Sequence, residues 1–338
     1  MSKQETYIMT SGRLARQDQT VVFTPIDEEG NEGKQKFLPI TNLHSIYVLC
    51  NNLEANNNLY MFLNQHGISV HFFDYYSNYA GSFCPKEKYQ SGFVHVQQTE
   101  FYLDTEKRIK IAQQFVLGAI HNMRVVLKYY ENRKDNFDSS ILEKLEYYLE
   151  EVPKATTIQI LMGLEGNARM QYYSAFDYII NDFKFERRSK QPPHNEINAL
   201  ISYGNMLLYT ACMNAIYEST LNNTVSYLHS PSARRNSLAL DISEIFKPFL
   251  VDRLIFELFN KKMIQSKHFR KEGIMCMLNE KGKEMFLRAY RDMMKETFMH
   301  RSLKKKVSKR HLLVLEARKL MKYVTGIDSE YKPFKAKW

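Results

Sequence analysis

Residues 109–123, with the sequence IKIAQQFVLGAIHNM, place apolar side chains at three- and four-residue spacing. Ile109, Ala112, Phe115, Ala119 and Met123 therefore fall on one face of a helix that has about 3.6 residues per turn. A half-buried strand would instead alternate at every second residue. This segment predicts a long amphipathic helix, and the chain is predicted to be helical from about residue 101 onward.

The same spacing recurs along the rest of the chain. It is found near residues 139–152, 167–183, 196–220, 237–260, 281–298 and 311–324, with breaks at Pro153, Pro192–Pro193, Pro231 and Gly273. No repeat of solenoid period accompanies it. Residues 101–338 are therefore predicted to form one large all-α domain.

The first 85 residues have a different pattern, rich in short β-prone runs. These runs are Tyr7–Met9, Val21–Phe23, Phe37–Leu38, Ile46–Leu49 and Val70–Phe73, with turn-like stretches such as Asp27–Asn31 and Asn56–Asn58 between them. One helix is predicted from Leu59 to a cap at Gly67. The predicted fold is α+β: a small β-rich N-terminal domain (1–85), a linker (86–100) and a larger all-α C-terminal domain (101–338).

Composition limits the class of protein. Charged residues interrupt every apolar run before the ~20 residues that a membrane helix needs, and the first residues lack an apolar signal region. The four cysteines are far apart and form no C-x-x-C pair, which argues against a disulfide framework or a thiolate zinc site. We expect a cytoplasmic protein with no membrane partner.

The net charge of +10 is concentrated near the C-terminus. Residues 261–338 contain 22 Lys and Arg against 8 Asp and Glu, a net charge of +14, whereas the first 260 residues sum to −4. Such a basic region suggests a polyanionic partner, most often nucleic acid; a solvated lysine-rich helix face is the alternative. We expect this region to hold DNA phosphates without reading sequence, through Lys304, Lys305, Lys306, Lys309 and Arg310.

Motifs for nucleotide or acyl chemistry are absent from the sequence. It has no P-loop, no dinucleotide-binding glycine pattern and no nucleophile elbow. Ser/His/Asp and Cys/His triads stay open, but no local pattern points to one. The residues that remain favour a metal site in the helical domain.

Glu165 is the first candidate. It lies between two glycines in the apolar sequence LMGLEGNA at residues 161–168. A surface carboxylate does not need glycines beside it, whereas Gly163 and Gly166 permit close approach of another backbone or a ligand. The alternative is a loosely built helix start in which Glu165 stabilises the N-terminal dipole.

His229 is the second candidate, at the end of a loop with the sequence YLHSP and just before the basic pair Arg234–Arg235. A single histidine is more often structural or exposed than functional. Asp241 and Glu244 are the third candidate, because their three-residue spacing places them on one face of an apolar helix, which Lys247 extends. A solvated stripe of charge is the alternative there.

The three candidates indicate more together than singly. Two carboxylates and one imidazole suit Mg²⁺ or Mn²⁺, hard ions that favour oxygen, and manganese tolerates nitrogen. Such a metal activates a hydroxyl or water and offsets the charge that builds on a phosphate, and a nearby lysine adds positive charge. Beside a basic C-terminal region, this predicts metal-dependent phosphodiester chemistry on nucleic acid.

Four motifs, in order and spacing, resemble the CRISPR-associated integrase-nuclease of spacer acquisition, the Cas-one family. They are GLEGNA at 163–168, KQPP at 190–193 leading into NALISYG at 198–204, His229, and SLALDISE at 237–244 followed by Lys247, Pro248 and Asp252. The resemblance covers essentially the whole chain, because the β-rich front and helical back also match the family's layout.

This resemblance implies metal ligands at Glu165, His229 and Glu244, with Asp241 as a neighbouring catalytic acid and Lys247 at a basic position of the family. Some members have a basic residue three positions after the histidine; here that position is Ser232. Arg234 or Arg235 could substitute for it in binding DNA.

The resemblance also implies partners: a homodimer, two copies of which flank a dimer of the small second Cas protein, Cas-two. The N-terminal domain is expected to carry the homodimer contact.

The leading hypothesis is a divalent-metal-dependent DNA endonuclease and integrase acting on duplex and branched DNA. The 3′-hydroxyl of a short foreign fragment would attack a phosphodiester at a repeat boundary of a CRISPR array, which needs no nucleotide cofactor. Two alternatives stay open: a non-catalytic nucleic-acid-binding scaffold and a metal-dependent hydrolase of small phosphoesters.

Overall fold

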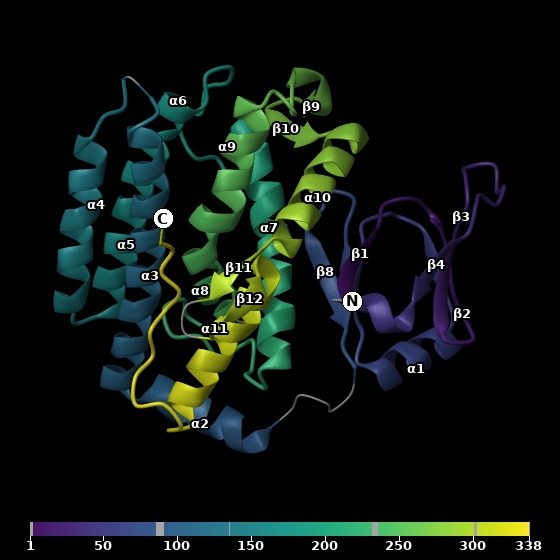
Figure 1. The fold of residues 1–338 in the computed structure, drawn as a ribbon, viewed down its shortest axis with the longest axis horizontal. Helices are drawn as coiled ribbons and strands as arrows, with labels where there is room; N and C mark the ends of the chain where they lie inside the picture. Colours follow the sequence, from purple (N-terminus) through teal and green to yellow (C-terminus); the bar gives the residue numbers. More distant parts are fainter. Residues whose placement is uncertain (1–2, 86–90, 135, 232–235, 301–302, 338) are drawn as a thin grey trace. The chain divides into compact units, whose positions relative to one another are not determined.

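The structure is a computed structural model that describes residues 3–85, 91–134, 136–231, 236–300 and 303–337 (Figure 1). The chain divides into two compact units, Met1–Tyr89 and Gln90–Trp338. The first unit is rich in strands and the second is mainly helical. The predicted α+β class, with the smaller strand-rich region first, is therefore confirmed.

Within residues 3–85, eight strands form two four-stranded sheets. The first sheet has the order β1 (Gln4–Ile8), β5 (Leu43–Val48), β7 (Ser69–Phe73) and β8 (Tyr79–Phe83). Its first three strands are parallel, and β8 pairs antiparallel with β7. The second sheet has the order β4 (Lys36–Pro39), β3 (Thr20–Pro25), β2 (Gly12–Gln17) and β6 (Leu53–Ala55). There β2, β3 and β4 are antiparallel, and β6 joins β2 in parallel.

The helix α1 (Asn57–His66) contributes Phe62 and Leu63 to the core of this unit. The Asn56 side chain accepts a hydrogen bond from the Leu59 N–H at 3.1 Å and so caps the first turn. Gly67, with φ 68°, ends the helix as predicted. The predicted turn at Asn56–Asn58 is wrong, because its second and third asparagines already belong to α1.

The described part of the second unit contains ten α-helices (Figure 1). They are α2 (Gly92–Leu103), α3 (Thr105–Glu131), α4 (Ser140–Glu151), α5 (Ile158–Ser174), α6 (Phe176–Ile179), α7 (Glu196–Glu218), α8 (Ser237–Phe246), α9 (Arg253–Asn260), α10 (Glu280–Lys295) and α11 (Lys309–Val324). A π-helical turn, Lys247–Asp252, joins α8 directly to α9.

Two sequence predictions about this unit need correction. It is not all-α, because it also contains the hairpins β9 (Phe269–Glu272)–β10 (Met275–Leu278) and β11 (Thr297–His300)–β12 (Lys305–Ser308). The predicted linker is also too long: α2 begins at Gly92, after the Ser91 hydroxyl caps the N–H of Val94 at 3.4 Å.

The helix α3 is central to the second unit and packs against α4, α5 and α8. It contains the segment that predicts a helix, and Ala112, Phe115, Ala119 and Met123 on its apolar face are fully buried. Gly118 lies against the C-terminal segment, where an added Cβ would be only 2.9 Å from the Pro333 Cβ. This packing fixes α5 and α8, the two helices that contain the predicted acids.

Among the described helices, none is both long enough and apolar enough to cross a membrane.

Candidate functional site

Glu165 lies in the middle of α5, two turns after the helix start, where the Thr157 hydroxyl caps the N–H of Ile160 at 3.2 Å. It is therefore too far from the N-terminus to stabilise the helix dipole, which acts within the first turn. Added Cβ atoms at Gly163 and Gly166 would meet nothing within 4 Å. The helix surface beside Glu165 is thus open, and no other backbone of the described chain approaches these glycines.

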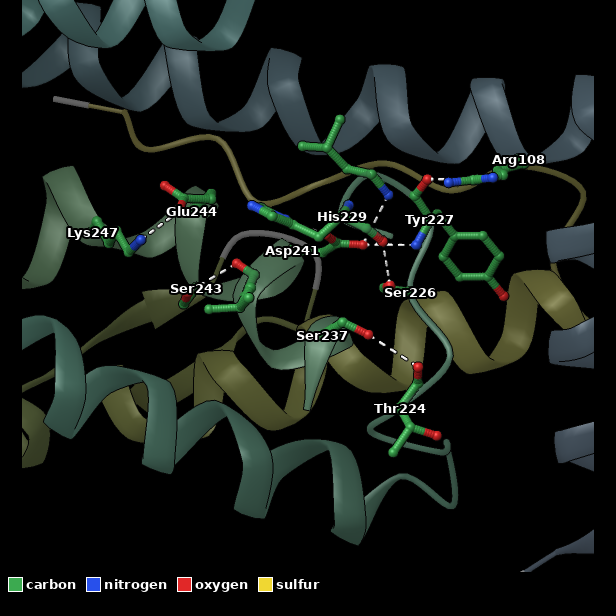
Figure 2. Close-up of polar contacts among 12 residues, drawn as sticks. Arg108, Thr224, Ser226, Tyr227, His229, Ser237, Asp241, Ser243, Glu244 and Lys247 are labelled. Atoms are coloured by element: carbon green, nitrogen blue, oxygen red, sulfur yellow. Dashed lines mark hydrogen bonds and ion pairs between the residues drawn. The ribbon is translucent and has the colours of Figure 1, made fainter. Parts of the chain in front are cut away.

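Asp241 faces inward from α8 and is fully buried. Its Oδ2 accepts hydrogen bonds from the Tyr227 and Leu228 N–H groups at 2.8 and 3.0 Å. Its Oδ1 accepts from the N–H of His229 at 3.0 Å and from the ring Nδ1 at 2.7 Å (Figure 2). Two bonds on each oxygen fill the accepting capacity of a carboxylate. Asp241 therefore organises the histidine loop and has no free oxygen for a metal.

His229 is held by this carboxylate in one orientation. Because Nδ1 is bonded to Asp241, Nε2 is the ring nitrogen left for a metal, as in carboxylate–histidine–metal arrangements. Burial is the largest single influence and lowers the pKa of His229, but the hydrogen bond and charge of Asp241 and the charges of Glu244 and Glu165 together outweigh it, so the pKa is raised overall.

Other contacts fix the loop that precedes His229. Arg108 Nε, from α3, donates to the Tyr227 carbonyl at 2.9 Å, and the Ser226 hydroxyl donates to the His229 carbonyl at 2.5 Å (Figure 2). The buried Gln98, from α2, donates to the carbonyls of Asn222 and Val225 at 2.9 and 2.7 Å. Contacts from two helices thus hold the histidine before any ligand binds.

Glu244 lies on α8 three residues after Asp241 and is paired with two cations, Arg169 from α5 and Lys247 from the π-helical turn. Arg169 also contacts the Glu165 Oε1 through its Nε at 3.0 Å. Burial opposes the charge on Glu244, yet Arg169 and Lys247 hold its pKa at about 2. Glu244 is therefore a carboxylate at neutral pH.

Arg169 was missed by the sequence analysis. Its four-residue distance from Glu165 is a signal, because residues at that spacing meet on a helix surface. Nothing in the spacing shows that the same guanidinium also reaches Glu244, which is 75 residues away. Among the described residues, no three His, Cys, Asp or Glu side chains form a preassembled metal cluster. Arg169 explains this, because it bridges the two acids.

The donor set nevertheless fits the predicted ion. Two carboxylates and an imidazole nitrogen suit Mg²⁺ or Mn²⁺. Glu244 lies on α8 one turn after Asp241, the residue that holds His229 (Figure 2), and one guanidinium joins Glu165 to Glu244. Ion pairs thus join Glu165, Glu244 and Lys247 through Arg169, and a hydrogen bond joins His229 to Asp241, one turn before Glu244 on α8.

The predicted DNA-binding residues are more scattered. Lys304, Lys305 and Lys306 are exposed, at the turn and second strand of the β11–β12 hairpin. Lys309 differs from the expectation, because its ammonium pairs with Glu296 at 2.6 Å and its side chain is largely buried. Arg310 is half-buried. Arg234 and Arg235 lie outside the described residues.

Comparisons with known proteins agree with one another. The family model for CRISPR associated protein Cas1 matches residues 6–292. A CRISPR-associated endonuclease Cas1 from Thermodesulfovibrio yellowstonii is 40% identical over 338 residues, covering 99% of this chain and 100% of that protein. A solved Cas1 structure from Thermotoga maritima has a TM-score of 0.83 at 36% identity, with 99% of this chain and 100% of that one covered.

A more distant solved structure, a Cas6-RT-Cas1–Cas2 complex, shares the fold: its TM-score is 0.80 at 20% identity, with 100% of this chain and 37% of that one covered. The family match over most of the chain and the full-length relative decide the assignment. The chain belongs to the CRISPR associated protein Cas1 family.

Proposed function

We propose that this protein is a divalent-metal-dependent DNA endonuclease and integrase that inserts short DNA fragments into a CRISPR array. The observation that supports the proposal is the pairing of Glu165 and Glu244 through Arg169, beside a His229 that is oriented by a saturated, buried Asp241 one turn before Glu244 on α8. The full-length relative is named an endonuclease, which agrees with this chemistry.

The metal would be held by the Glu165 and Glu244 carboxylates and by the Nε2 of His229. Bound there, Mg²⁺ or Mn²⁺ supplies Lewis acidity toward a phosphate and its attacking hydroxyl. Asp241 keeps the imidazole in the tautomer that presents Nε2. Lys247 is positioned by Glu244 and adds a second positive charge near a bound phosphate.

The joining step exchanges one phosphodiester for another. The 3′-oxygen of the incoming fragment forms a bond to phosphorus at the repeat boundary, and the bond from that phosphorus to the 3′-oxygen of the repeat strand breaks. The attacking hydroxyl loses a proton and the departing oxygen gains one. The reaction needs no free energy from hydrolysis of a nucleoside triphosphate, which is consistent with a sequence that lacks a P-loop.

Joining and cleavage of duplex and branched oligonucleotides, with and without Mn²⁺, test this function. Wild-type protein should cleave or join only with the metal, and Glu165→Gln should lose both activities. Glu150→Gln, at an exposed position on α4, is the matched control and should retain them. Metal-independent DNA binding without reaction would favour the scaffold, and turnover of small phosphoesters unaffected by DNA would favour the hydrolase.

We further propose that the protein works as a homodimer in the cytoplasm and assembles with Cas2. The support for the Cas2 partner is the fold shared with the Cas1–Cas2 complex. The support for DNA as the other partner is the net charge of +14 over residues 261–338 and the exposed Lys304–Lys306.

A further inference from the structure

Arg169 takes the position between the two carboxylates that the proposed metal would bind. Its Nε contacts Glu165 at 3.0 Å and its Nη2 contacts Glu244. All three side chains are at least four-fifths buried, so two neighbouring carboxylates here need a positive charge between them. In this arrangement the guanidinium supplies that charge.

The third nitrogen of the same guanidinium is unsatisfied. Arg169 Nη1 is buried and has no hydrogen-bond partner in the described part of the chain. Leaving a buried hydrogen-bond donor without an acceptor costs free energy, and the cost is larger when the donor is charged. The present contacts of Arg169 therefore do not exhaust its capacity to bind a further acceptor.

An acceptor of matching charge lies nearby. Asp252, the last residue of the π-helical turn, is 1% exposed. Neither of its carboxylate oxygens has a hydrogen-bond partner among the described residues. Burial raises the pKa of Asp252 to about 7, and the nearby charge of Arg169 is the strongest influence against that rise. A guanidinium with one unpaired nitrogen thus acts electrostatically on a buried acid, and the Tyr172 hydroxyl also lowers the pKa of that acid.

We propose that Arg169 neutralises Glu165 and Glu244 when the divalent metal is absent, and that it moves to Asp252 when the metal binds. This inference rests on the proposed metal site. In the metal-bound state the ion would replace the guanidinium between the two carboxylates, and Asp252 would receive the displaced charge. Arg169 is then a competitor of the metal, and Asp252 is a positioning residue that acts through Arg169.

Calorimetric titration of the full-length protein with Mn²⁺ tests the competition. Arg169→Gln removes the cation that the metal must displace, so its Kd for Mn²⁺ should fall by about tenfold, which corresponds to about 1.4 kcal/mol. Without metal, the Tm of Arg169→Gln should lie below that of the wild type. On adding Mn²⁺, it should rise by more than the wild-type Tm does. An unchanged or higher Kd for Arg169→Gln would overturn the proposal.

Two further variants control this result. Arg124→Gln breaks an ion pair between α3 and α4, with Glu146, elsewhere in the same unit, and should leave the Kd unchanged. Arg169→Lys keeps the positive charge, so this variant should fold even if Arg169→Gln does not. A lysine ammonium cannot bridge both acids as a forked guanidinium does, so the Kd of this variant should lie between wild type and Arg169→Gln. A Kd for Arg169→Lys at or above that of wild type would count against the proposal.

Asp252→Asn tests the second position. It should raise the Kd for Mn²⁺, because the displaced Arg169 loses its acceptor, and it should have no effect in the Arg169→Gln background. An equal effect in both backgrounds would show that Asp252 does not act through Arg169. If the wild-type protein binds no Mn²⁺, the proposed metal site itself is refuted. If the wild type binds Mn²⁺ and Arg169→Gln binds it no more tightly, only the inference about Arg169 is refuted.

Discussion

Asp241 accepts hydrogen bonds from the backbone N–H groups of three consecutive residues, 227–229, and from the ring of His229. A carboxylate used in this way has no oxygen left for a metal, so the proposed site would have three protein ligands rather than four. One carboxylate thus fixes both the path of the loop and the orientation of the imidazole. We therefore propose a positioning role for Asp241 in place of the predicted catalytic role.

Asp241→Asn should weaken Mn²⁺ binding by about 10–100-fold, the usual effect of losing a group that orients a metal-ligating histidine. The amide retains one accepting oxygen, so the variant should fold while the ring of His229 loses its fixed tautomer. Calorimetry with Mn²⁺ measures the effect. Ser243→Ala, on the same helix, removes a hydroxyl bonded to its own helix carbonyl at 2.9 Å and should bind as the wild type does.

The C-terminal segment after α11 is a fixed part of the helical unit. Asn122, fully buried on α3, accepts from the Ala336 N–H at 2.8 Å and donates to the carbonyls of Ile245 and Phe334 at 2.7 and 3.2 Å. Ile245 follows the proposed ligand Glu244 directly. The Phe334 ring also stacks on Phe246, with ring centroids 5.3 Å apart. The segment thus ties the end of α8 to α3.

Asn122→Ala should lower the free energy of unfolding by about 3 kcal/mol, because it leaves three buried backbone groups without a partner. Urea denaturation of the full-length protein measures this loss. Lys110→Ala, at an exposed position of the same helix, should change it by less than about 0.5 kcal/mol. Equal effects of the two substitutions would show that Asn122 does not hold the segment.

In the N-terminal unit, burial of His71 on β7 lowers its pKa to about 3. The unfolded chain takes up this proton near pH 6.5, so between these pH values it binds more protons than the folded chain. Stability should therefore fall as the pH falls below about 6.5, by at most about 1.4 kcal/mol per pH unit. His71→Asn does not titrate and should show a shallower fall between pH 6.5 and 4 in urea denaturation.

His66→Asn, at the end of α1, is the control and should keep the wild-type slope. Parallel curves for wild type and His71→Asn would contradict the prediction.

Helices and buried strands were predictable because their apolar periodicity follows from burial, as residues 109–123 of α3 illustrate. The strand β2, with the sequence GRLARQ, was missed because half of its residues face solvent and are polar, two of them arginines. Gly273 was interpreted as a helix break, whereas its φ of 58° forms the turn of the β9–β10 hairpin. Such turns depend on backbone angles, which periodicity does not report.

The proposed ligands rest on a different signal: their motifs have local spacing and together resemble one family, and the relationship to that family is confirmed. The Arg169 bridge was not predictable, because it joins residues on two helices that only the fold brings together. Nor does the sequence alone show that Lys309 is already paired with Glu296.

For the whole molecule, the exposed lysines predict sequence-independent binding of DNA phosphates. Replacing Lys304, Lys305 and Lys306 with Ala should weaken binding to every duplex alike. The salt slope should also become shallower, by at most about 0.9 for each phosphate that the protein no longer neutralises. Fluorescence anisotropy over a salt series measures both effects. Mn²⁺ affinity should be unchanged, and an effect confined to one repeat sequence would indicate base recognition instead.

We propose that the homodimer contact lies in the N-terminal unit. The second unit has its own buried core, so a protein without residues 1–85 should fold and be a monomer. Mass measurement in solution tests this, and a truncated protein that stays dimeric would place the contact elsewhere.

We propose that Glu165, His229 and Glu244 act together on one metal, and rates of Mn²⁺-dependent strand joining test this claim most directly. Residues that act as a unit are non-additive. Each single alanine variant should therefore abolish joining about as completely as any double variant, with the circular dichroism spectrum unchanged. A single variant that joins oligonucleotides at the wild-type rate, or losses that multiply in the double variants, would contradict the claim.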